Sequence, residues 1–259
     1  MKIQDIHYVV EGKGSAIVLL HGFLEDMTMW DEFTVKLIKE NYTVIRIDLL
    51  GHGKTTSQDA VYSMEEQAEI VKFVLDKEDI LEAVIIGHSM GGYVTLAFAE
   101  EYPQMVKGFS LFFSSAAEDN SKKKIQRNRV ADLVKTQRDS FIRVAIPNLF
   151  YNNEKKELQP FIEKTKRMAN KISTENIIAS IYGMRSRKDR IHVLHSYIPK
   201  QLLVGVFDTA LDQDSLKKQI DIANNLDYKV FDIGHMGHYE APELTFDEVK
   251  LFVDKCYYN

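Results

Sequence analysis

The chain has 259 residues, 45% of them apolar and 27% charged, which are ordinary globular values and argue against an intrinsically disordered chain. Its 33 basic and 38 acidic residues give a net charge of −5, which removes the global electrostatic argument for binding nucleic acid. No apolar run approaches the ~18 residues of a membrane span, and a single cysteine, Cys256, excludes an internal disulfide. Because Met1–Glu11 shows no leader-like pattern, we expect a cytoplasmic protein that contacts neither membrane nor nucleic acid.

Short apolar runs alternate with helical patterns through the first 117 residues. The runs are too short for buried helices and predict strands covered on both faces: Ala16–Leu20, Thr43–Ile47, Ala83–Ile86 and Val106–Phe113. The intervening patterns predict helices over Thr34–Lys39, Ser63–Leu75 and Gly92–Glu101. Ser63 and Glu66 occupy the two positions of a capping box at the start of the second helix. This alternation predicts an α/β fold with a mostly parallel central sheet flanked by helices.

The alternation stops between residues 118 and 196, where apolar residues recur only at helical spacing. It resumes with the strands Gln201–Phe207 and Tyr228–Ile233, followed by a last helix after Pro242. We therefore expect a core of residues 1–117 and 197–259, interrupted by a helical cap of residues 118–196. Apolar cap residues such as Val144, Ile146 and Phe150 are expected mostly to pack the cap against the core.

Charge is distributed unevenly between these two parts. Residues 118–196 hold 18 Lys and Arg against 9 Asp and Glu, a net charge of +9, and the remainder holds 15 against 29, a net charge of −14. The basic excess either complements the acidic core or raises the local concentration of a substrate that carries a carboxylate. The run Lys122–Lys124, with Arg127 and Arg129, is expected to be a solvated helical face or a hinge rather than an anion site.

The segment Gly87–Gly91 matches G-x-S-x-G and stands between a predicted strand and a predicted helix. In this context the turn holds its serine, Ser89, in strained backbone geometry, and a side chain at either glycine would collide with a neighbouring element. The alternative is a glycine-rich turn with an incidental serine. The context favours Ser89 as a nucleophile.

A serine hydroxyl needs a histidine to accept its proton and an acid to orient that histidine. His235 follows the last predicted strand directly and is our candidate base, and His238, three residues on, is its rival. No other histidine pattern, such as H-E-x-x-H, indicates a metal site, so we expect neither a metal nor a cofactor.

The acid should come from the loop after the strand Gln201–Phe207. Asp208 is the first carboxylate there, whereas Asp212 and Asp214 are better placed to cap the next helix. Glu118 and Asp119, after an earlier strand, are the alternatives.

The chemistry also needs two N–H donors directed at the oxyanion of the intermediate. The turn around Ser89 supplies the N–H of Met90. The loop that begins His21-Gly22-Phe23, after the first predicted strand, offers the N–H of Phe23.

The chain resembles the α/β-hydrolase superfamily, in particular its capped, esterase-like branch. The resemblance covers residues 21–259 apart from the insert and rests on five motifs in family order: His21-Gly22-Phe23, Asp48-Leu49-Leu50-Gly51-His52-Gly53, Gly87-His88-Ser89-Met90-Gly91-Gly92, Gly205-Val206-Phe207-Asp208, and Gly234-His235 with Glu240-Ala241-Pro242. It implies that Ser89 is the nucleophile, Asp208 the acid and His235 the base, with Phe23 and Met90 forming the oxyanion hole. The serine in the turn Gly87–Gly91 argues against the dehalogenase and epoxide-hydrolase members of the family, which carry an aspartate at that position.

The expected function is hydrolysis of a small carboxylic ester through an acyl-enzyme intermediate, with a small-molecule ester as the only expected partner. One alternative is a triad enzyme that hydrolyses a carbon–carbon bond or performs an elimination on an anionic substrate. Another is a receptor that binds a small ligand without turnover. The sequence gives no oligomeric state.

Overall fold

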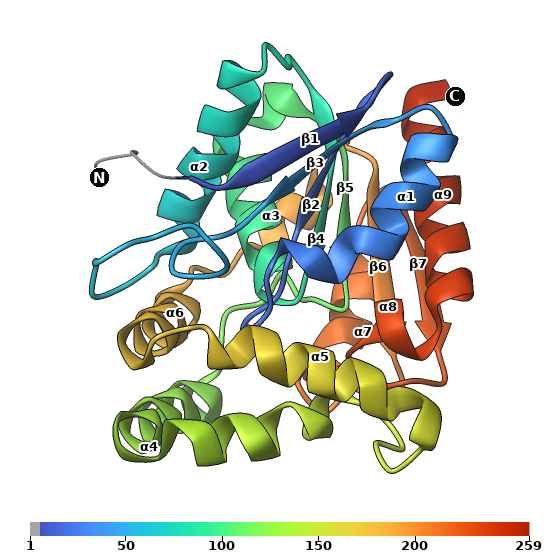
Figure 1. Cartoon of the computed structure of the whole chain (residues 1–259). Helices are drawn as coiled ribbons and strands as arrows, with labels where there is room; N and C mark the ends of the chain where they lie inside the picture. Colours follow the sequence, from blue (N-terminus) through green and yellow to red (C-terminus); the bar gives the residue numbers. More distant parts are fainter. Residues whose placement is uncertain (1–5, 259) are drawn as a thin grey trace.

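The structure, a computed structural model, describes residues 6–258 and is built around a seven-stranded sheet (Figure 1). The strands follow the order β1-β3-β2-β4-β5-β6-β7, and all neighbours are parallel except β1 and β3. Their bounds are Tyr8–Gly12 (β1), Ala16–Leu20 (β2), Thr43–Ile47 (β3), Ala83–His88 (β4), Val106–Phe112 (β5), Lys200–Gly205 (β6) and Leu226–Phe231 (β7). The predicted fold class is confirmed. The first five residues of Met1–Glu11, the segment without a leader-like pattern, lie outside the described residues.

Helices cover both faces of the sheet because successive side chains of a strand point to opposite faces. On β2, Val18 and Leu20 pack in an apolar cluster with α2 and α3, whereas Ile17 and Leu19 pack with α1 and α9. The core helices are α1 (Asp31–Lys39), α2 (Met64–Lys77), α3 (Met90–Glu101), α7 (Gln213–Ile222), α8 (Gly237–Glu240) and α9 (Pro242–Tyr258), with short 3₁₀ turns at Met27–Trp30 and Pro103–Met105. No helix within residues 6–258 is both long and apolar enough to cross a membrane.

The predicted capping box at the start of α2 is present. The Ser63 hydroxyl accepts a bond from the N–H of Glu66 at 3.2 Å, and the Glu66 carboxylate accepts one from the N–H of Ser63 at 3.0 Å. Such a cap stabilises a helix by about 1 kcal/mol. It fixes where α2 begins, one residue after the predicted start.

Several strands differ from the sequence-based expectation: β7 begins and ends two residues earlier than predicted, and β4 ends two residues later. β1, which no pattern indicated, is a half-buried edge strand whose Tyr8 lies opposite Ile47 of β3. β6 ends at Gly205, two residues before the predicted end, because the chain turns there and leaves Val206 and Phe207 45% and 41% exposed.

The segment between β5 and β6 is helical and lies beyond the carboxyl ends of the parallel strands, below the sheet in Figure 1. It contains α4 (Ser121–Ala145), α5 (Gln159–Asn170) and α6 (Thr174–Ser186), with 3₁₀ turns at Pro147–Leu149, Lys156–Leu158 and Ile191–His195. An apolar cluster joins it to the core, where Phe150 and Ile146 pack with Leu24 and Tyr239. Val144, expected in such packing, is instead 60% exposed.

Candidate active site

Ser89 stands at the turn between β4 and α3 with a φ of 49° and a ψ of −111°, a strained conformation for a residue with a side chain. The flanking glycines permit this turn. A Cβ at Gly87 would lie 2.3 Å from the backbone of Gly91, and a Cβ at Gly91 would lie 2.5 Å from the carbonyl oxygen of Leu20. The close approach of helix and strand therefore excludes any larger residue at both positions.

His235 lies on the loop after β7 and is hydrogen-bonded to Asp208, which lies just after β6. The distance from Nδ1 of His235 to Oδ2 of Asp208 is 2.6 Å, and the other carboxylate oxygen accepts a bond from the N–H of Ala210 at 2.8 Å. Burial alone would lower the pKa of His235, but the charge of Asp208 and the hydrogen bond to it outweigh burial and raise that pKa above its ordinary value. Asp208 therefore stabilises the protonated ring of His235.

The rival histidine, His238, has a different environment. Its Nε2 lies 3.5 Å from Oε1 of Glu25, and both of its ring nitrogens lack a hydrogen-bond partner within the described part of the chain. Burial lowers its pKa to about 4. It therefore packs as a neutral ring.

The other candidate acids are engaged elsewhere. Asp212 caps α7 by accepting a bond from the N–H of Ser215 at 3.1 Å, and Asp214 lies in the first turn of that helix. Glu118 forms an exposed ion pair with a lysine of α4, and Asp119 binds two arginines. Of the five carboxylates considered, only Asp208 contacts the His235 ring.

Ser89 and His235 line the same cavity, which has a volume of about 150 Å³. The cavity lies between the core and the helical insert, since both contribute to its walls. The remaining lining residues are Phe23, Leu24, Glu25, His88, Tyr93, Lys123, Arg127, Phe141, Ala145, Leu149, Met184, Ala210, Leu211 and Met236.

The two candidate oxyanion donors border this site. Phe23 lines the cavity, and Met90 is the first residue of α3, directly after Ser89. An N–H at a helix start has no partner within the helix, so the Met90 N–H is available to a ligand.

Glu25 is a buried residue of the site that the sequence analysis missed. Its Oε2 lies 2.7 Å from Nδ1 of His88, and Nε2 of His88 lies 3.1 Å from the carbonyl oxygen of His235. The same carboxylate accepts a bond from the N–H of Gly22 at 3.0 Å. Burial alone would raise the pKa of Glu25, but His88 and His238 lower it well below its ordinary value. His88 thus links the loop of Phe23 to the loop of His235.

Glu240 holds the His235 loop from the other side. Its carboxylate accepts bonds from the N–H groups of Gly234, Met236 and Tyr151 at 3.0, 3.0 and 2.9 Å. Tyr151 belongs to the insert, so this carboxylate ties the loop to both parts of the chain. The family motif had marked Glu240, but only the structure gives its contacts.

Comparison with known proteins agrees with this architecture. The sequence profile of the alpha/beta hydrolase fold family matches residues 15–242. The chain belongs to this family. Its sheet order and the strand–turn–helix at Ser89 are those of an α/β-hydrolase.

Individual relatives cover different shares of the chain. A thermophilic esterase from Thermogutta terrifontis, solved with malate bound, is 28% identical with a TM-score of 0.90, over 97% of this chain and 94% of that one. A pyrrolizixenacetamide deacetylase from Xenorhabdus hominickii is 24% identical over 255 residues, 94% of this chain and 93% of that protein. An uncharacterized protein of Mycobacterium tuberculosis is 40% identical over 97 residues, only 28% of that protein's length.

Proposed function

We propose that this α/β-hydrolase cleaves small carboxylic esters through an acyl-enzyme intermediate, with Ser89, His235 and Asp208 as its triad. The observation that carries the proposal is the 2.6 Å hydrogen bond between His235 and Asp208, together with the position of His235 in the wall of the cavity that Ser89 also lines. This bond occupies Nδ1 and leaves Nε2 for proton transfer with the serine. The likeness to an esterase at 28% identity over nearly the whole chain supports the reaction class.

In the acylation step, Ser89 Oγ attacks the ester carbonyl carbon while Nε2 of His235 accepts the hydroxyl proton. The N–H groups of Phe23 and Met90 bind the oxyanion of the tetrahedral intermediate. When the carbon–oxygen bond to the leaving group breaks, His235 returns its proton to the departing oxygen, which leaves as the alcohol. Asp208 stabilises the imidazolium throughout.

In the deacylation step, water attacks the acyl-enzyme and His235 accepts its proton, then returns it to Ser89 Oγ. The acid is released and ionises at neutral pH, so the net reaction converts an ester and water into a carboxylate, an alcohol and a proton. No cofactor enters this scheme. A cavity of about 150 Å³ favours short substrates.

The test is hydrolysis of 4-nitrophenyl acetate and butyrate by wild type and by Ser89→Ala. We expect wild type to turn both over rapidly and the variant to lose several orders of magnitude in kcat, because triad members act as a unit. A fluorophosphonate should inactivate wild type and appear on Ser89 in peptide mass spectra. The far-UV circular dichroism of the variant controls for folding.

Other outcomes separate the competing functions. A folded Ser89→Ala variant that keeps more than about a tenth of the wild-type kcat would refute the nucleophile. Trace ester turnover together with labelling of Ser89 would favour carbon–carbon bond hydrolysis or elimination. Absence of both turnover and labelling would favour a ligand receptor.

A further inference from the structure

Two groups of basic residues in the insert lie against the core or the cavity, and acidic residues of the core neutralise the first group. Arg190, on the segment that returns to β6, places Nη2 2.7 Å from Oε1 of Glu65 and Nε 2.9 Å from Oε2 of Glu100. Lys188 lies 3.2 Å from the same Glu65. Here the positive charge of the insert complements the acidic core.

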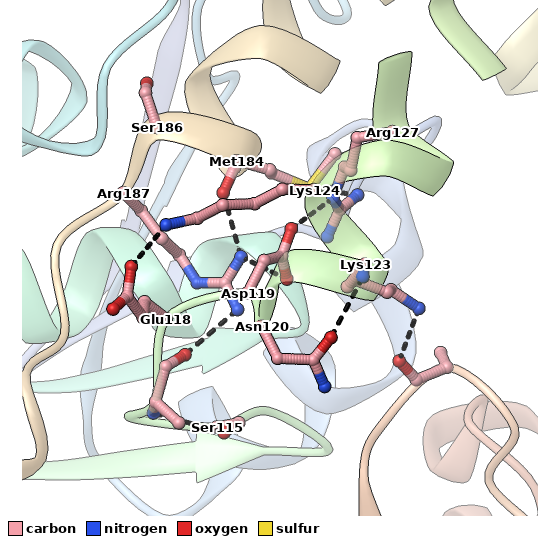
Figure 2. Close-up of polar contacts among 12 residues, drawn as sticks. Ser115, Glu118, Asp119, Asn120, Lys123, Lys124, Arg127, Met184, Ser186 and Arg187 are labelled. Carbon is pink, nitrogen blue, oxygen red and sulfur yellow. Dashed lines mark hydrogen bonds and ion pairs between the residues drawn. The ribbon is translucent and has the colours of Figure 1, made fainter. Parts of the chain in front are cut away.

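The second group surrounds Asp119 at the start of α4 (Figure 2). Oδ2 of Asp119 lies 2.7 Å from Nε of Arg127, and Oδ1 lies 2.7 Å from Nη1 of Arg187. Burial alone would raise the pKa of Asp119, but the two guanidinium groups lower it, so the carboxylate is ionised. One negative charge is thus shared between two arginines.

Lys123 adds a third cation to this cluster. Its ammonium donates to the carbonyl oxygen of Ala210 at 3.2 Å, and no carboxylate of residues 6–258 lies within 4.0 Å of it. Burial is the main cause that lowers the pKa of Lys123, and repulsion by Arg127 and Arg187 lowers this pKa further. Three cations therefore face one carboxylate.

Two further carboxylates near the cavity are bound to histidines and therefore do not compensate this surplus. Glu25 lines the cavity but is paired with His88. Asp208 attracts Lys123 over a longer distance but is hydrogen-bonded to His235. The Lys123 ammonium, which has three N–H donors, keeps donors free for a ligand.

Lys123 also lies where the cavity meets the outside. It lines both the cavity of Ser89 and a more open surface groove, which share Tyr93, Ala210 and Leu211 as further walls. The groove also carries Lys122, Arg129 and Arg187, together with the carboxylates of Glu118, Asp119 and Asp212. Glu118 is paired with Lys124 and Asp119 with two arginines, so an anion that approaches along the groove still meets a small excess of positive charge.

We propose that Lys123, supported by Arg127, forms an anion subsite, and that the preferred substrate carries an ionised carboxylate in addition to the ester that is cleaved. This inference rests on the proposed ester hydrolysis. A carboxylate on the substrate accepts charge-assisted hydrogen bonds from the ammonium and balances part of the surplus charge. The short cavity requires the carboxylate to lie only a few atoms from the ester.

The experiment compares anionic esters with neutral esters of the same shape by proton release in a pH-stat. Monoethyl succinate places the carboxylate on the acyl side, and ethyl 4-methylpentanoate replaces that carboxylate by an isopropyl group. The pair 3-acetoxypropanoate and 3-methylbutyl acetate does the same on the alcohol side. We expect wild type to prefer the anionic member of at least one pair, and Lys123→Met to lower that preference, the ratio of the two kcat/KM values, at least tenfold.

Two further variants control for charge alone. Lys124→Met removes the same charge one residue along α4, but Lys124 pairs with Glu118 and does not line the cavity, so the ratio should stay within about twofold of wild type. Lys123→Arg keeps the charge and should retain more of the preference than Lys123→Met.

Failure of this inference is distinguishable from failure of the proposed function. If neutral esters are hydrolysed but Lys123→Met leaves the ratio unchanged in both pairs, the subsite is wrong and the esterase stands. If no ester is hydrolysed, calorimetric titration with monoethyl succinate decides. If Lys123→Met weakens the binding of monoethyl succinate at least tenfold, the subsite is supported. If wild type and the variant bind it equally, or if wild type does not bind it detectably, the subsite is wrong.

Discussion

At the scale of single residues, His235 and His238 show how one contact reverses the effect of burial. Both rings are buried, and burial favours the neutral imidazole in both. The carboxylate of Asp208, 2.6 Å from His235, overcomes this effect, whereas Glu25, 3.5 Å from His238 and already bound to His88, does not. Of these two histidines, only His235 has surroundings that favour the protonated ring.

A direct comparison of the two histidines tests this difference. His235→Ala should lose nearly all activity toward 4-nitrophenyl butyrate, whereas His238→Phe should keep most of it. In wild type, kcat/KM should rise with pH through an apparent pKa above the ordinary histidine value of about 6.5, because the base must be neutral and its pKa is raised. The opposite ranking of the variants, or a rate that is constant from pH 5 to 8, would contradict the assignment.

A second residue prediction concerns the acid. Asp208→Asn preserves shape but removes the charge that orients and stabilises the His235 imidazolium, so kcat should fall at least about a hundredfold. Asp212→Asn is the matched control. Asp212 caps α7, and asparagine caps helices about as well, so its kcat should change by only a few-fold. Equal rates for the two variants would remove Asp208 from the triad.

Chain order and strand ends were enough to predict where Ser89, Asp208 and His235 lie. They follow β4, β6 and β7, and the carboxyl ends of parallel strands meet at one edge of the sheet, whereas their catalytic roles stay a prediction. The sequence did not predict that Glu25 and Lys123 belong to the site, because their roles depend on contacts between segments distant in sequence. The acid directly after Phe23 and Leu24 was the one local signal for Glu25, and a lysine run offers no signal for which lysine faces the cavity.

At the scale of elements, prediction followed the strength of the local pattern. The five-residue strands β2 and β3 have the predicted bounds, because runs rich in β-branched residues and too short for a buried helix favour strands. β1 was missed, since its half-buried residues are held by pairing with β3, more than thirty residues away. Long-range pairing of an edge strand leaves little trace in its own sequence.

The helical insert shows the same limit. Spacing recovered its helical nature but not which side of each helix meets the core. Val144 was expected to pack and is 60% exposed, whereas Lys123, in a run expected to be solvated or hinge-like, lines the cavity. α4 departs from helical geometry at Gln137, with a φ of −138° and a ψ of 38°, so a single periodicity does not describe its whole length.

At the scale of the whole molecule, buried ionisable groups make the fold sensitive to acid. Burial lowers the pKa of His52 to about 3 and that of His238 to about 4. In the unfolded chain each protonates near pH 6.5, so acidification below that value favours unfolding. His235 acts in the opposite sense, because its raised pKa adds stability below pH 6.5 that is lost as the pH rises through the folded value. The lowered pKa of Glu25 adds a further loss below about pH 4.3.

The free energy of unfolding should therefore fall between pH 7.5 and 5, above the range in which carboxylates titrate. For a pKa that drops from 6.5 to about 4, the loss by pH 5 is about 2 kcal/mol, and His52 adds a similar amount. His238→Phe removes one titrating group, and the replacement ring packs against Trp30 and Phe112 as the imidazole does. Urea unfolding of this variant at pH 7.5 and 5 should show a loss about 2 kcal/mol smaller than that of wild type. Equal losses in wild type and His238→Phe would show that His238 titrates normally in the folded protein.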